Sequence, residues 1–292
     1  MLQLYNNFND DNDNNKWGEI YFNQFSRGYI VSSQGPRKFM EDSWVISVSN
    51  SIIIYGIFDG HSGDYISKRL PKLFKTILLK QIDEIRHDKK KIISVINNFF
   101  IDIDKIFYNK WQNDKFNQDG STACIIICID NDIYFINLGD SRSLFFNKNK
   151  IIFSSHDHKP NKTIEKTRII NAKHTVINRS GIYRINGSLA VSRSFGDFIY
   201  KLSDKNTYDG ITSAVSVIPN ITVINVEDRT KPRYIVLASD GLWDVFTNKE
   251  IQKFITGSLA KGITTKKILS DLIKLAYLRN SHDNISIILI YI

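Results

Sequence analysis

The chain has 292 residues, and 42% of them are hydrophobic, which is enough apolar material for a sizeable core and argues against global disorder. Its formal net charge of +9 is compatible with nucleic acid, an acidic membrane surface or phosphorylated substrates as partners. The lysines are spread along the chain and form no basic helix, so we expect no nucleic-acid-binding surface.

No segment resembles a membrane span or an export signal. No apolar stretch reaches transmembrane length, and the N-terminus lacks a basic region followed by an apolar one. We therefore expect a soluble protein without a transmembrane segment, located in the cytoplasm or also in the nucleus. Residues 6–15 are almost all Asn and Asp, which predicts a disordered lead-in over residues 1–16 and a single domain over residues 17–292.

The first part of this domain is predicted to contain strands followed by two helices. Three apolar runs are typical of strands: Tyr29–Ser33, Trp44–Ser49 and Ile52–Phe58. Apolar residues at helical spacing then predict one helix between Leu70 and Ile85 and another between Ile92 and Phe107. Pro71 is expected to break or kink the first of these helices.

The second part begins with a strand meander. Four apolar runs joined by tight polar turns predict antiparallel hairpins: Ala123–Ile129, Ile133–Leu138, Ser143–Phe146 and Ile151–Phe153. This pattern argues against a doubly wound parallel sheet, whose strands need helical crossovers. Residues 156–220 look irregular apart from a short helix over Lys162–Ile170. The remaining predicted elements are strands Ile221–Val226, Tyr234–Ser239 and Ile285–Tyr291 and helices Lys249–Ile255 and Thr264–Tyr277.

The two cysteines lie in one predicted strand. Cys124 and Cys128 are four residues apart, so they share a face of that strand but are too far apart along it for a local disulfide. We expect buried core thiols and a reducing compartment rather than a redox or metal site.

Aspartates occur at the ends of the long apolar strands. Asp59 and Asp240 each follow a strand and precede a glycine, Asp140 follows Ile133–Leu138, and Asp283 precedes the last strand. A single Asp-Gly pair is most simply a turn. Four together suggest that the strand ends meet and that the carboxylates converge.

Converging carboxylates repel one another strongly in a partly buried site. Such a group persists when its members are protonated or when cations neutralise them. Ligands that are all oxygen select hard ions, which favours Mg²⁺ or Mn²⁺ over Zn²⁺. The pattern therefore predicts a centre for divalent cations at one end of the sheets.

Eight short motifs occur in a fixed order along nearly the whole chain. They are Arg37-Lys38-Phe39-Met40-Glu41-Asp42, Phe58-Asp59-Gly60-His61-Ser62-Gly63, Asp119-Gly120-Ser121-Thr122-Ala123, Asn137-Leu138-Gly139-Asp140-Ser141-Arg142, Asp157-His158-Lys159-Pro160, Leu189 to Asp197, Ala238 to Asp244, and Asp283-Asn284-Ile285-Ser286. Any one of them is a weak signal. Their order resembles that of the type 2C, or PPM, family of metal-dependent protein serine/threonine phosphatases.

The resemblance implies an α+β fold in which an antiparallel sandwich of two sheets has helices on both outer faces, with two Mn²⁺ or Mg²⁺ ions, and a weaker third, at one end. The direct metal ligands that it implies are Asp59, which bridges the two ions, Asp240, Asp283 and the carbonyl of Gly60. The positions that it implies for metal-bound waters or the third ion are Glu41, Asp42, Asp140 and Asp244.

The resemblance also implies the reaction, in which metal-activated water attacks the phosphorus of phosphoserine or phosphothreonine in phosphorylated protein substrates. Arg37 is expected to bind the phosphoryl group, and His61 is favoured as the general acid for the leaving oxygen over a purely structural histidine. His158 and Arg193 are expected to be structural. We expect a monomer.

Two regions of the sequence need separate comment, one residue that departs from the family pattern and one segment that matches the family's flap. Ser62 stands where the family usually has glycine, and serine fits unless that position needs a positive φ, so a small distortion is expected but no loss of metal. Residues 162–183 are expected to form the family's flap beside the active site, where substrate choice is tuned.

Two other functions compete with this interpretation. A pseudophosphatase would keep the fold as a binding module, but such a protein has no need of Asp59, Asp240 and Asp283. A hydrolase of nucleotides or other small phosphoesters would share the metal chemistry, and activity on phosphopeptides against nucleotides distinguishes it.

Overall fold

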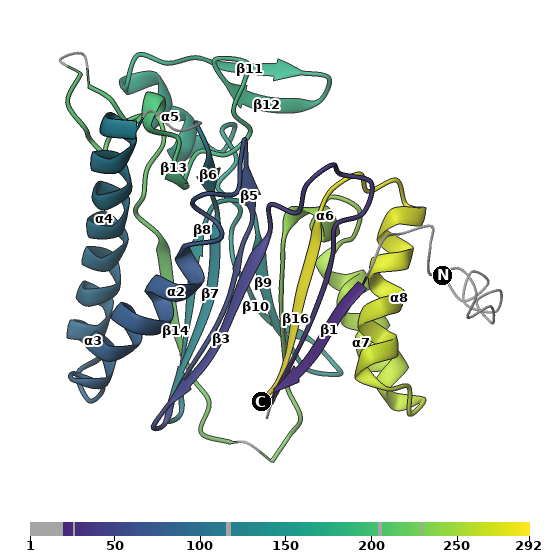
Figure 1. The fold of residues 1–292 in the computed structure, drawn as a ribbon. Coiled ribbons are helices and arrows are strands. Elements are labelled where there is room, and N and C mark those ends of the chain that lie inside the picture. Colours follow the sequence, from purple (N-terminus) through teal and green to yellow (C-terminus); the bar gives the residue numbers. More distant parts are fainter. Residues whose placement is uncertain (1–19, 26, 115–117, 204–205, 229) are drawn as a thin grey trace.

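The structure is a computed structural model that describes residues 20–25, 27–114, 118–203, 206–228 and 230–292 (Figure 1). The lead-in predicted over residues 1–16 lies outside the described residues. Two antiparallel sheets pack face to face, and helices cover both outer faces, which confirms the predicted sandwich (Figure 1).

The first sheet has six strands. Its order is β1 (Ile20–Phe25), β2 (Gly28–Ser33), β16 (Ile285–Tyr291), β15 (Tyr234–Ala238), β9 (Arg142–Phe146) and β10 (Ile151–Ser154). The last strand of the chain therefore lies between two earlier ones and pairs with both, from Ile285 opposite Ser33 on one side to Ile287 opposite Ala238 on the other. Strand β1 was not among the predicted elements.

The second sheet has five strands. Its order is β14 (Asn220–Asn225), β8 (Asp132–Leu138), β7 (Ala123–Ile129), β4 (Ile52–Phe58) and β3 (Ser43–Ser49). The predicted hairpins are confirmed, because β7 pairs with β8 and β9 pairs with β10 in antiparallel register. A small sheet of β5 (Gly60–His61), β6 (Gly120–Ser121) and β13 (Phe195–Gly196) joins distant loops at one end.

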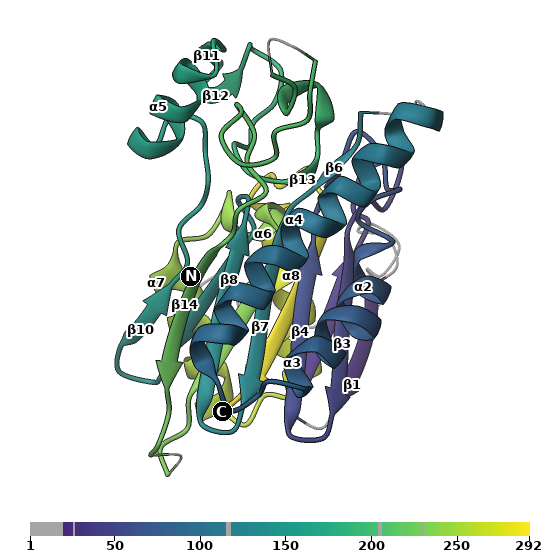
Figure 2. The same cartoon turned by 90° about the vertical axis from the view of Figure 1, so that its left-hand side faces the viewer.

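Helices cover the five-stranded sheet on its outer side (Figure 2). They are α2 (Leu70–Leu73), a π-helical turn (Phe74–Leu78), α3 (Leu79–Asp83) and α4 (Lys89–Asp114). The prediction of a break or kink at Pro71 is wrong. Pro71 lies in the first helical turn, where a missing N–H costs nothing, and the irregularity is the π-helical turn that follows.

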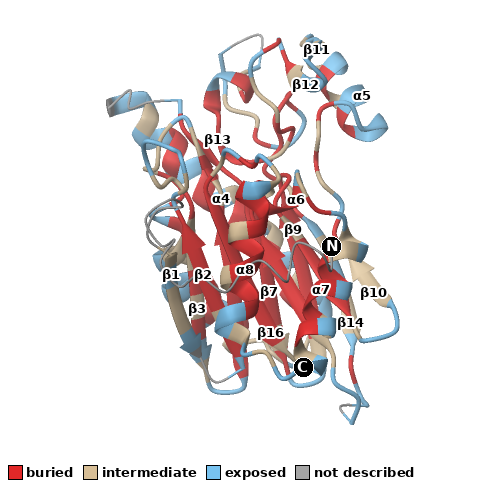
Figure 3. Ribbon diagram, turned by 90° about the vertical axis from the view of Figure 1, so that its right-hand side faces the viewer, coloured by how far each residue is buried: buried red, intermediate tan, exposed pale blue. Residues whose placement is uncertain are grey.

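The outer side of the six-stranded sheet carries α6 (Asp240–Trp243), α7 (Asn248–Ala260) and α8 (Thr265–Leu278). Three apolar layers follow from this arrangement, one between the sheets and one beneath each group of helices. Figure 3 shows buried residues along the central strands and exposed ones mainly in the connecting loops and on the helix surfaces. Cys124 is buried and Cys128 half-buried beside the layer between the sheets, and neither forms a disulfide, as predicted.

The segment predicted to be irregular contains more structure than expected. It includes α5 (Thr163–Asn171), close to the predicted helix, and then a hairpin of β11 (Val176–Arg179) and β12 (Ile182–Ile185). Its turn holds Ser180 and Gly181 at φ of 52° and 90°, so this Ser-Gly pair was a hairpin signal that the prediction missed. No helix in the described part of the chain is long and apolar enough to cross a membrane.

Candidate metal centre

Strand ends at one end of the sandwich carry the four predicted aspartates. Asp59 follows β4, Asp140 follows β8, Asp240 begins α6 directly after β15, and Asp283 lies just before β16. All four line one cavity of about 300 Å³, together with Arg37, Glu41, Gly60 and His61. We call this cavity the cleft. Asp42 and Asp244 are not part of its lining.

Two carboxylates of the cleft, Asp59 and Asp240, have raised pKa values. Burial, and then repulsion from Asp240 and the other nearby aspartates, raises the pKa of Asp59 well above its usual range. Burial, and then repulsion from Asp140, raises the pKa of Asp240 in the same way. The centre therefore needs positive charge if these carboxylates are to ionise together.

Two cationic side chains supply part of that charge. Arg37 Nη2 lies 2.5 Å from Asp283 Oδ2, and Lys159 Nζ lies 2.5 Å from Asp140 Oδ2. Burial lowers the pKa of Lys159, because it disfavours the charged form. Attraction to Asp140 and Asp240 outweighs this effect, so the net shift of the lysine pKa is upward. Sequence analysis gave Lys159 no role, although it belongs to one of the eight motifs.

The donor atoms of the cleft fit hard divalent cations, although they do not form a finished ligand shell. In the described part of the chain, no three His, Cys, Asp or Glu side chains already meet in a geometry that could hold an ion. Asp283 and Asp140 each use one carboxylate oxygen, Oδ2, to pair with Arg37 and Lys159. The donors are nonetheless all oxygen, and the raised pKa values of Asp59 and Asp240 are those of carboxylates that lack a counter-charge.

Asp42 lies next to this centre with an unused donor atom. Its Oδ2 accepts a hydrogen bond of 2.9 Å from Ser239, whereas its buried Oδ1 has no partner among the described residues. Burial raises the pKa of Asp42 to about 7. Hydrogen bonds from the hydroxyls of Ser286 and Ser239 lower this pKa, but they do not offset the effect of burial. A buried carboxylate oxygen without a partner fits a site that holds a water or an ion.

His61 is held by a carboxylate that the sequence analysis missed. Its Nε2 lies 2.8 Å from Asp197 Oδ2, and Ser194 donates a 2.5 Å hydrogen bond to the same oxygen. Burial lowers the pKa of His61, but Asp197 outweighs it, and the net shift is upward. Gly120 makes room for this pair, because a Cβ there would lie 2.4 Å from His61 Nε2 and 2.3 Å from Asp197 Oδ2.

The loop that carries Asp59 contains the one departure from the family pattern. Ser62 has a φ of 59°, so this position does need the left-handed conformation that favours glycine. Two hydrogen bonds hold the backbone of the loop on either side of Ser62. The Asp59 amide donates to Thr122 Oγ1 at 3.2 Å, and the Gly63 amide donates to Glu41 Oε1 at 2.7 Å. The expected small distortion is therefore a strained serine.

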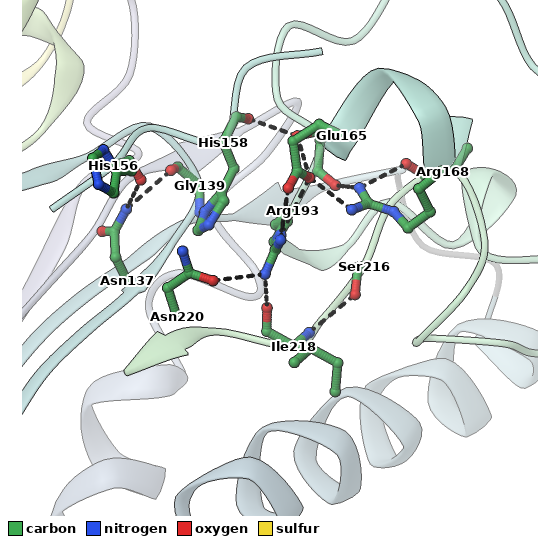
Figure 4. Close-up of polar contacts among 12 residues, drawn as sticks. Asn137, Gly139, His156, His158, Glu165, Arg168, Arg193, Ser216, Ile218 and Asn220 are labelled. Atoms are coloured by element: carbon green, nitrogen blue, oxygen red, sulfur yellow. Dashed lines mark hydrogen bonds and ion pairs between the residues drawn. The ribbon is translucent and has the colours of Figure 1, made fainter. Parts of the chain in front are cut away.

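A polar network behind the cleft braces its loops (Figure 4). His158 Nδ1 accepts a 3.0 Å hydrogen bond from the amide of Gly139, the residue before Asp140. Burial, and then the charge of Arg193, lowers the pKa of His158 to about 4. Arg193 pairs with Glu165 at 2.6 Å, so both His158 and Arg193 have the structural roles that were predicted.

A larger cavity of about 620 Å³ lies beside this network. Its lining includes Arg142, Asp157, Glu165 and Arg193, but none of the four strand-end aspartates. The carboxylates of this lining already have cationic partners, since Asp157 pairs with Arg142 at 2.6 Å and Glu165 pairs with Arg193. The smaller cleft is therefore the better candidate for chemistry.

Comparisons with known proteins agree on one family. The chain matches the protein phosphatase 2C family model over residues 27–285. It is 35% identical over 271 residues to probable protein phosphatase 2C 7 of Oryza sativa subsp. japonica. This alignment covers 91% of this chain and 66% of that protein. It is 32% identical over 274 residues to protein phosphatase 1A of Homo sapiens. That alignment covers 89% of this chain and 69% of the human protein.

Solved structures extend the agreement to the fold. A phosphatase structure from Toxoplasma gondii superposes with a TM-score of 0.75 at 20% identity, over 92% of this chain and 94% of that one. A serine-threonine phosphatase 2C structure from Toxoplasma gondii gives 0.74 at 18% identity, over 94% and 99%. With the family match spanning most of its length, the chain belongs to the protein phosphatase 2C family.

Proposed function

We propose that this chain is a metal-dependent protein phosphatase that hydrolyses phosphoserine and phosphothreonine in phosphorylated proteins. The family to which it belongs is metal-dependent. The observation that carries the proposal is the meeting of Asp59, Asp140, Asp240 and Asp283 in one cleft with Arg37. A cleft with this much negative charge suits metal-assisted chemistry on a phosphate.

Two divalent cations would be held by Asp59, Asp240, Asp283 and the carbonyl of Gly60. Glu41 and Asp42 would hold waters of these ions, and Asp140 and Asp244 a weaker third ion. When bound, the two cations would lower the pKa of a water for in-line attack on phosphorus and neutralise phosphoryl oxygens. The all-oxygen donor set and the raised pKa values of Asp59 and Asp240 support this assignment.

Arg37 would anchor the phosphoryl group at the mouth of the cleft. Its side chain is half exposed, and its Nε donates a 2.9 Å hydrogen bond to the carbonyl of His282, which fixes the guanidinium beside Asp283. Once Asp283 turns to a cation, the Nη groups of Arg37 are free to donate to two phosphoryl oxygens, a geometry that favours arginine over lysine.

His61 would give a proton to the leaving oxygen of the serine or threonine. The leaving alkoxide is strongly basic, so a nearby proton lowers the barrier. Asp197 orients the imidazole through the 2.8 Å contact with Nε2 and raises its pKa, which keeps a proton available near neutral pH. Asp197 acts through His61 and is therefore a positioning residue.

The test is turnover of a phosphothreonine peptide by the full chain, with Mn²⁺ or Mg²⁺ and with a chelator. We expect turnover that needs added metal and disappears on chelation. Nucleoside triphosphates should be poor substrates under the same conditions. Full activity in metal-free buffer would contradict the mechanism, and a protein that binds phosphopeptides without turnover would be a pseudophosphatase.

A further inference from the structure

The larger cavity, of about 620 Å³, lies between α5 and the edges of the two sheets. Strand β10 ends the six-stranded sheet, β14 ends the five-stranded sheet, and α5 lies above both of them (Figure 2). Ser154 of β10, Asn220 of β14 and the first residues of α5 line this space, which we call the α5 cavity. Its volume is that of an ordinary ligand site, and among the described residues none lines both it and the cleft.

The first turn of α5 meets this cavity without a cap. Lys162, Thr163, Ile164 and Glu165 all line the space. Lys162 is the N-cap residue, and its side chain has no acceptor to offer. Within the described part of the chain, no other acceptor binds the amides of the three residues that follow. Uncapped amides, together with the positive end of a helix dipole, favour an anion.

The charged side chains of the lining leave one cation without a partner. The two carboxylates already pair with arginines, Asp157 with Arg142 and Glu165 with Arg193. Lys162 is exposed, and none of the ion pairs between described residues involves it. The charge that remains beside the uncapped amides is therefore positive.

His158 adds a buried donor to the same lining. Only 3% of this residue is exposed, and its Nδ1 accepts a hydrogen bond from the amide of Gly139, so the neutral imidazole carries its own proton on Nε2. Burial, and then the charge of Arg193, lower the pKa of His158 to about 4, so the ring is neutral near pH 7. The Nε2–H group has no hydrogen-bond partner among the described residues.

The side chain of Asn220 does not supply the missing acceptor (Figure 4). Asn220 acts on the pKa of His158, but its Oδ1 accepts from Arg193 Nη1 at 3.1 Å and not from His158 Nε2. A buried N–H group without an acceptor is destabilising, and an oxygen atom of a ligand in the cavity would satisfy it. The amides of α5 and the imidazole thus indicate the same kind of ligand through independent observations.

We propose that the α5 cavity binds a small organic anion, whose carboxylate or phosphate group accepts hydrogen bonds from the first amides of α5, from Lys162 and from His158 Nε2. The hydroxyl and amide side chains of the lining suit a polar ligand body: Ser154, Ser155, Thr163, Asn220 and Asn248. Because different residues line the cavity and the cleft, this site does not depend on the phosphatase function proposed above.

The experiment is a calorimetric titration of the full chain after treatment with a chelator and dialysis. Glycerol 3-phosphate and glycerate are the probes, because they share a polar three-carbon body and differ in the anionic group. We expect at least one of them to bind with a Kd of about 0.1–5 mM, and uncharged glycerol to bind at least about tenfold more weakly. The probe that binds more tightly identifies the anionic group.

The cleft offers a second place for an anion, at Arg37. In the absence of metal, the carboxylates of the cleft repel anions. Arg37→Gln should therefore change the Kd of the probe by less than about twofold. A large loss of affinity in this variant would place the probe in the cleft and overturn the proposal.

Substitution at Thr163 tests the helix amides. Lys162 has a φ of −68° and a ψ of 140°, the extended conformation that a residue before proline adopts, and proline is favoured at the first helical position. Thr163→Pro should therefore remove one amide donor, keep the helix and raise the Kd by about three- to tenfold. Thr163→Ala is the matched control, because it keeps the amide and loses only the hydroxyl, and it should raise the Kd by less than about twofold.

Two further substitutions test the side chains. Lys162→Gln removes the unpaired charge and should raise the Kd by about three- to tenfold, an effect that shrinks as salt is raised. Lys166→Gln is its control, because Lys166 is an exposed cation one turn further along α5 that does not line the cavity. His158→Asn can still accept from the Gly139 amide but has no donor at the position of Nε2, and it should also weaken binding. Thermal unfolding checks that each variant is folded.

The outcomes separate the two proposals. If neither probe binds, or if Lys162→Gln and Thr163→Pro bind as tightly as the wild type, the anion site is wrong. Equal losses in Lys162→Gln and Lys166→Gln would show a general effect of charge and would also overturn it. Phosphopeptide turnover is measured separately. A chain that binds a probe without hydrolysing phosphopeptides would contradict the phosphatase function and support the anion site.

Discussion

Two groups of buried carboxylates in this molecule have opposite surroundings. Around Asp59, several aspartates face one another, and two of them pair with a cation, Asp283 with Arg37 and Asp140 with Lys159. Around Asp104, by contrast, a single carboxylate is surrounded by donors. Its Oδ2 accepts from Lys201 Nζ at 2.7 Å and from the Tyr208 hydroxyl at 2.6 Å.

The Asp104 group has no remaining need of a ligand. Asp104 and Lys201 are both completely buried, and the other oxygen of Asp104 accepts from the Gly196 amide at 2.8 Å. Such a fully paired group fixes the packing of its elements, here α4 against the loop after β13. The cleft is the reverse case, in which repulsion is tolerated at a place where cations are expected to bind.

The two groups are also connected through the chain. Lys201 donates to the carbonyl of Ser194, and Ser194 in turn donates to Asp197, which holds His61. The paired group thus supports the loop that positions His61, the proposed general acid. The buried carboxylate of Asp104 is fully paired, as expected of a group that stabilises the fold, whereas those around Asp59 are proposed to bind metal, and variants can separate the two roles.

The largest effect is expected at the repulsive group. Asp59→Asn and Asp240→Asn should each lower kcat/KM by about a thousandfold or more, because a metal would lose a main ligand. With a chelator present, their thermal stability should be equal to or higher than that of the wild type, since repulsion is relieved. Thermal unfolding with and without metal is the measurement. A variant with normal turnover would make that aspartate a mere turn residue.

Removal of the general acid should depend on the leaving group. His61→Ala should slow phosphopeptide hydrolysis by roughly 10²–10⁴-fold, but p-nitrophenyl phosphate much less, because nitrophenolate leaves without a proton. Asp197→Asn should show the same bias to a smaller degree. The ratio of the kcat/KM losses on the two substrates, at saturating metal, is the readout. Equal losses would mean that His61 only braces the loop of Asp59.

At the paired group, removal of one charge should cost stability instead. Asp104→Asn leaves Lys201 buried without its counter-charge, and we expect the free energy of unfolding to fall by about 3 kcal/mol. Lys68→Gln is the control, because it breaks the exposed pair with Asp64 and should cost less than about 1 kcal/mol. Urea denaturation measures both. Similar costs in the two variants would remove the contrast between buried and exposed pairs.

A pH series should reveal the buried carboxyl of Asp42. Because the pKa of Asp42 is raised to about 7 in the folded state, this state keeps a proton that the unfolded chain loses near pH 4. With a chelator, the free energy of unfolding should therefore fall by roughly 3 kcal/mol as the pH rises from about 5 to about 7.5. Asp42→Asn should flatten this fall.

Two comparisons control the pH series. The lowered pKa of His158 acts in the opposite direction below about pH 6.5, so the difference between wild type and Asp42→Asn is the quantity to compare. Saturating Mg²⁺ or Mn²⁺ should reverse the slope, because metal ligands must be deprotonated. Identical slopes for the two proteins would show that Asp42 is ionised in the folded state.

Much of this arrangement was predictable from the sequence. The apolar strands joined by tight turns indicated antiparallel hairpins, the resemblance to the type 2C family implied the sandwich, and the aspartates at strand ends indicated the cleft. The roles of Lys159 and Asp197 could not be predicted from the sequence, because each depends on contacts between segments that are distant along the chain. Asp104 and Lys201 are 97 residues apart, and no motif in the sequence connects them.

The smallest effect is expected for a change at Ser62, which acts on the backbone conformation of the loop in the cleft. A left-handed conformation costs a non-glycine residue about 1–2 kcal/mol, while glycine loses about 0.5–1 kcal/mol through its greater freedom when unfolded. Ser62→Gly should therefore stabilise the fold by about 0.5–1 kcal/mol, with less than about a twofold change in turnover. Ser180→Gly, at a φ of 52° in the exposed hairpin turn, is the matched control and should gain a similar amount. A gain at Ser180 but a loss at Ser62, measured by urea denaturation, would show that the Ser62 side chain itself supports the loop of Asp59.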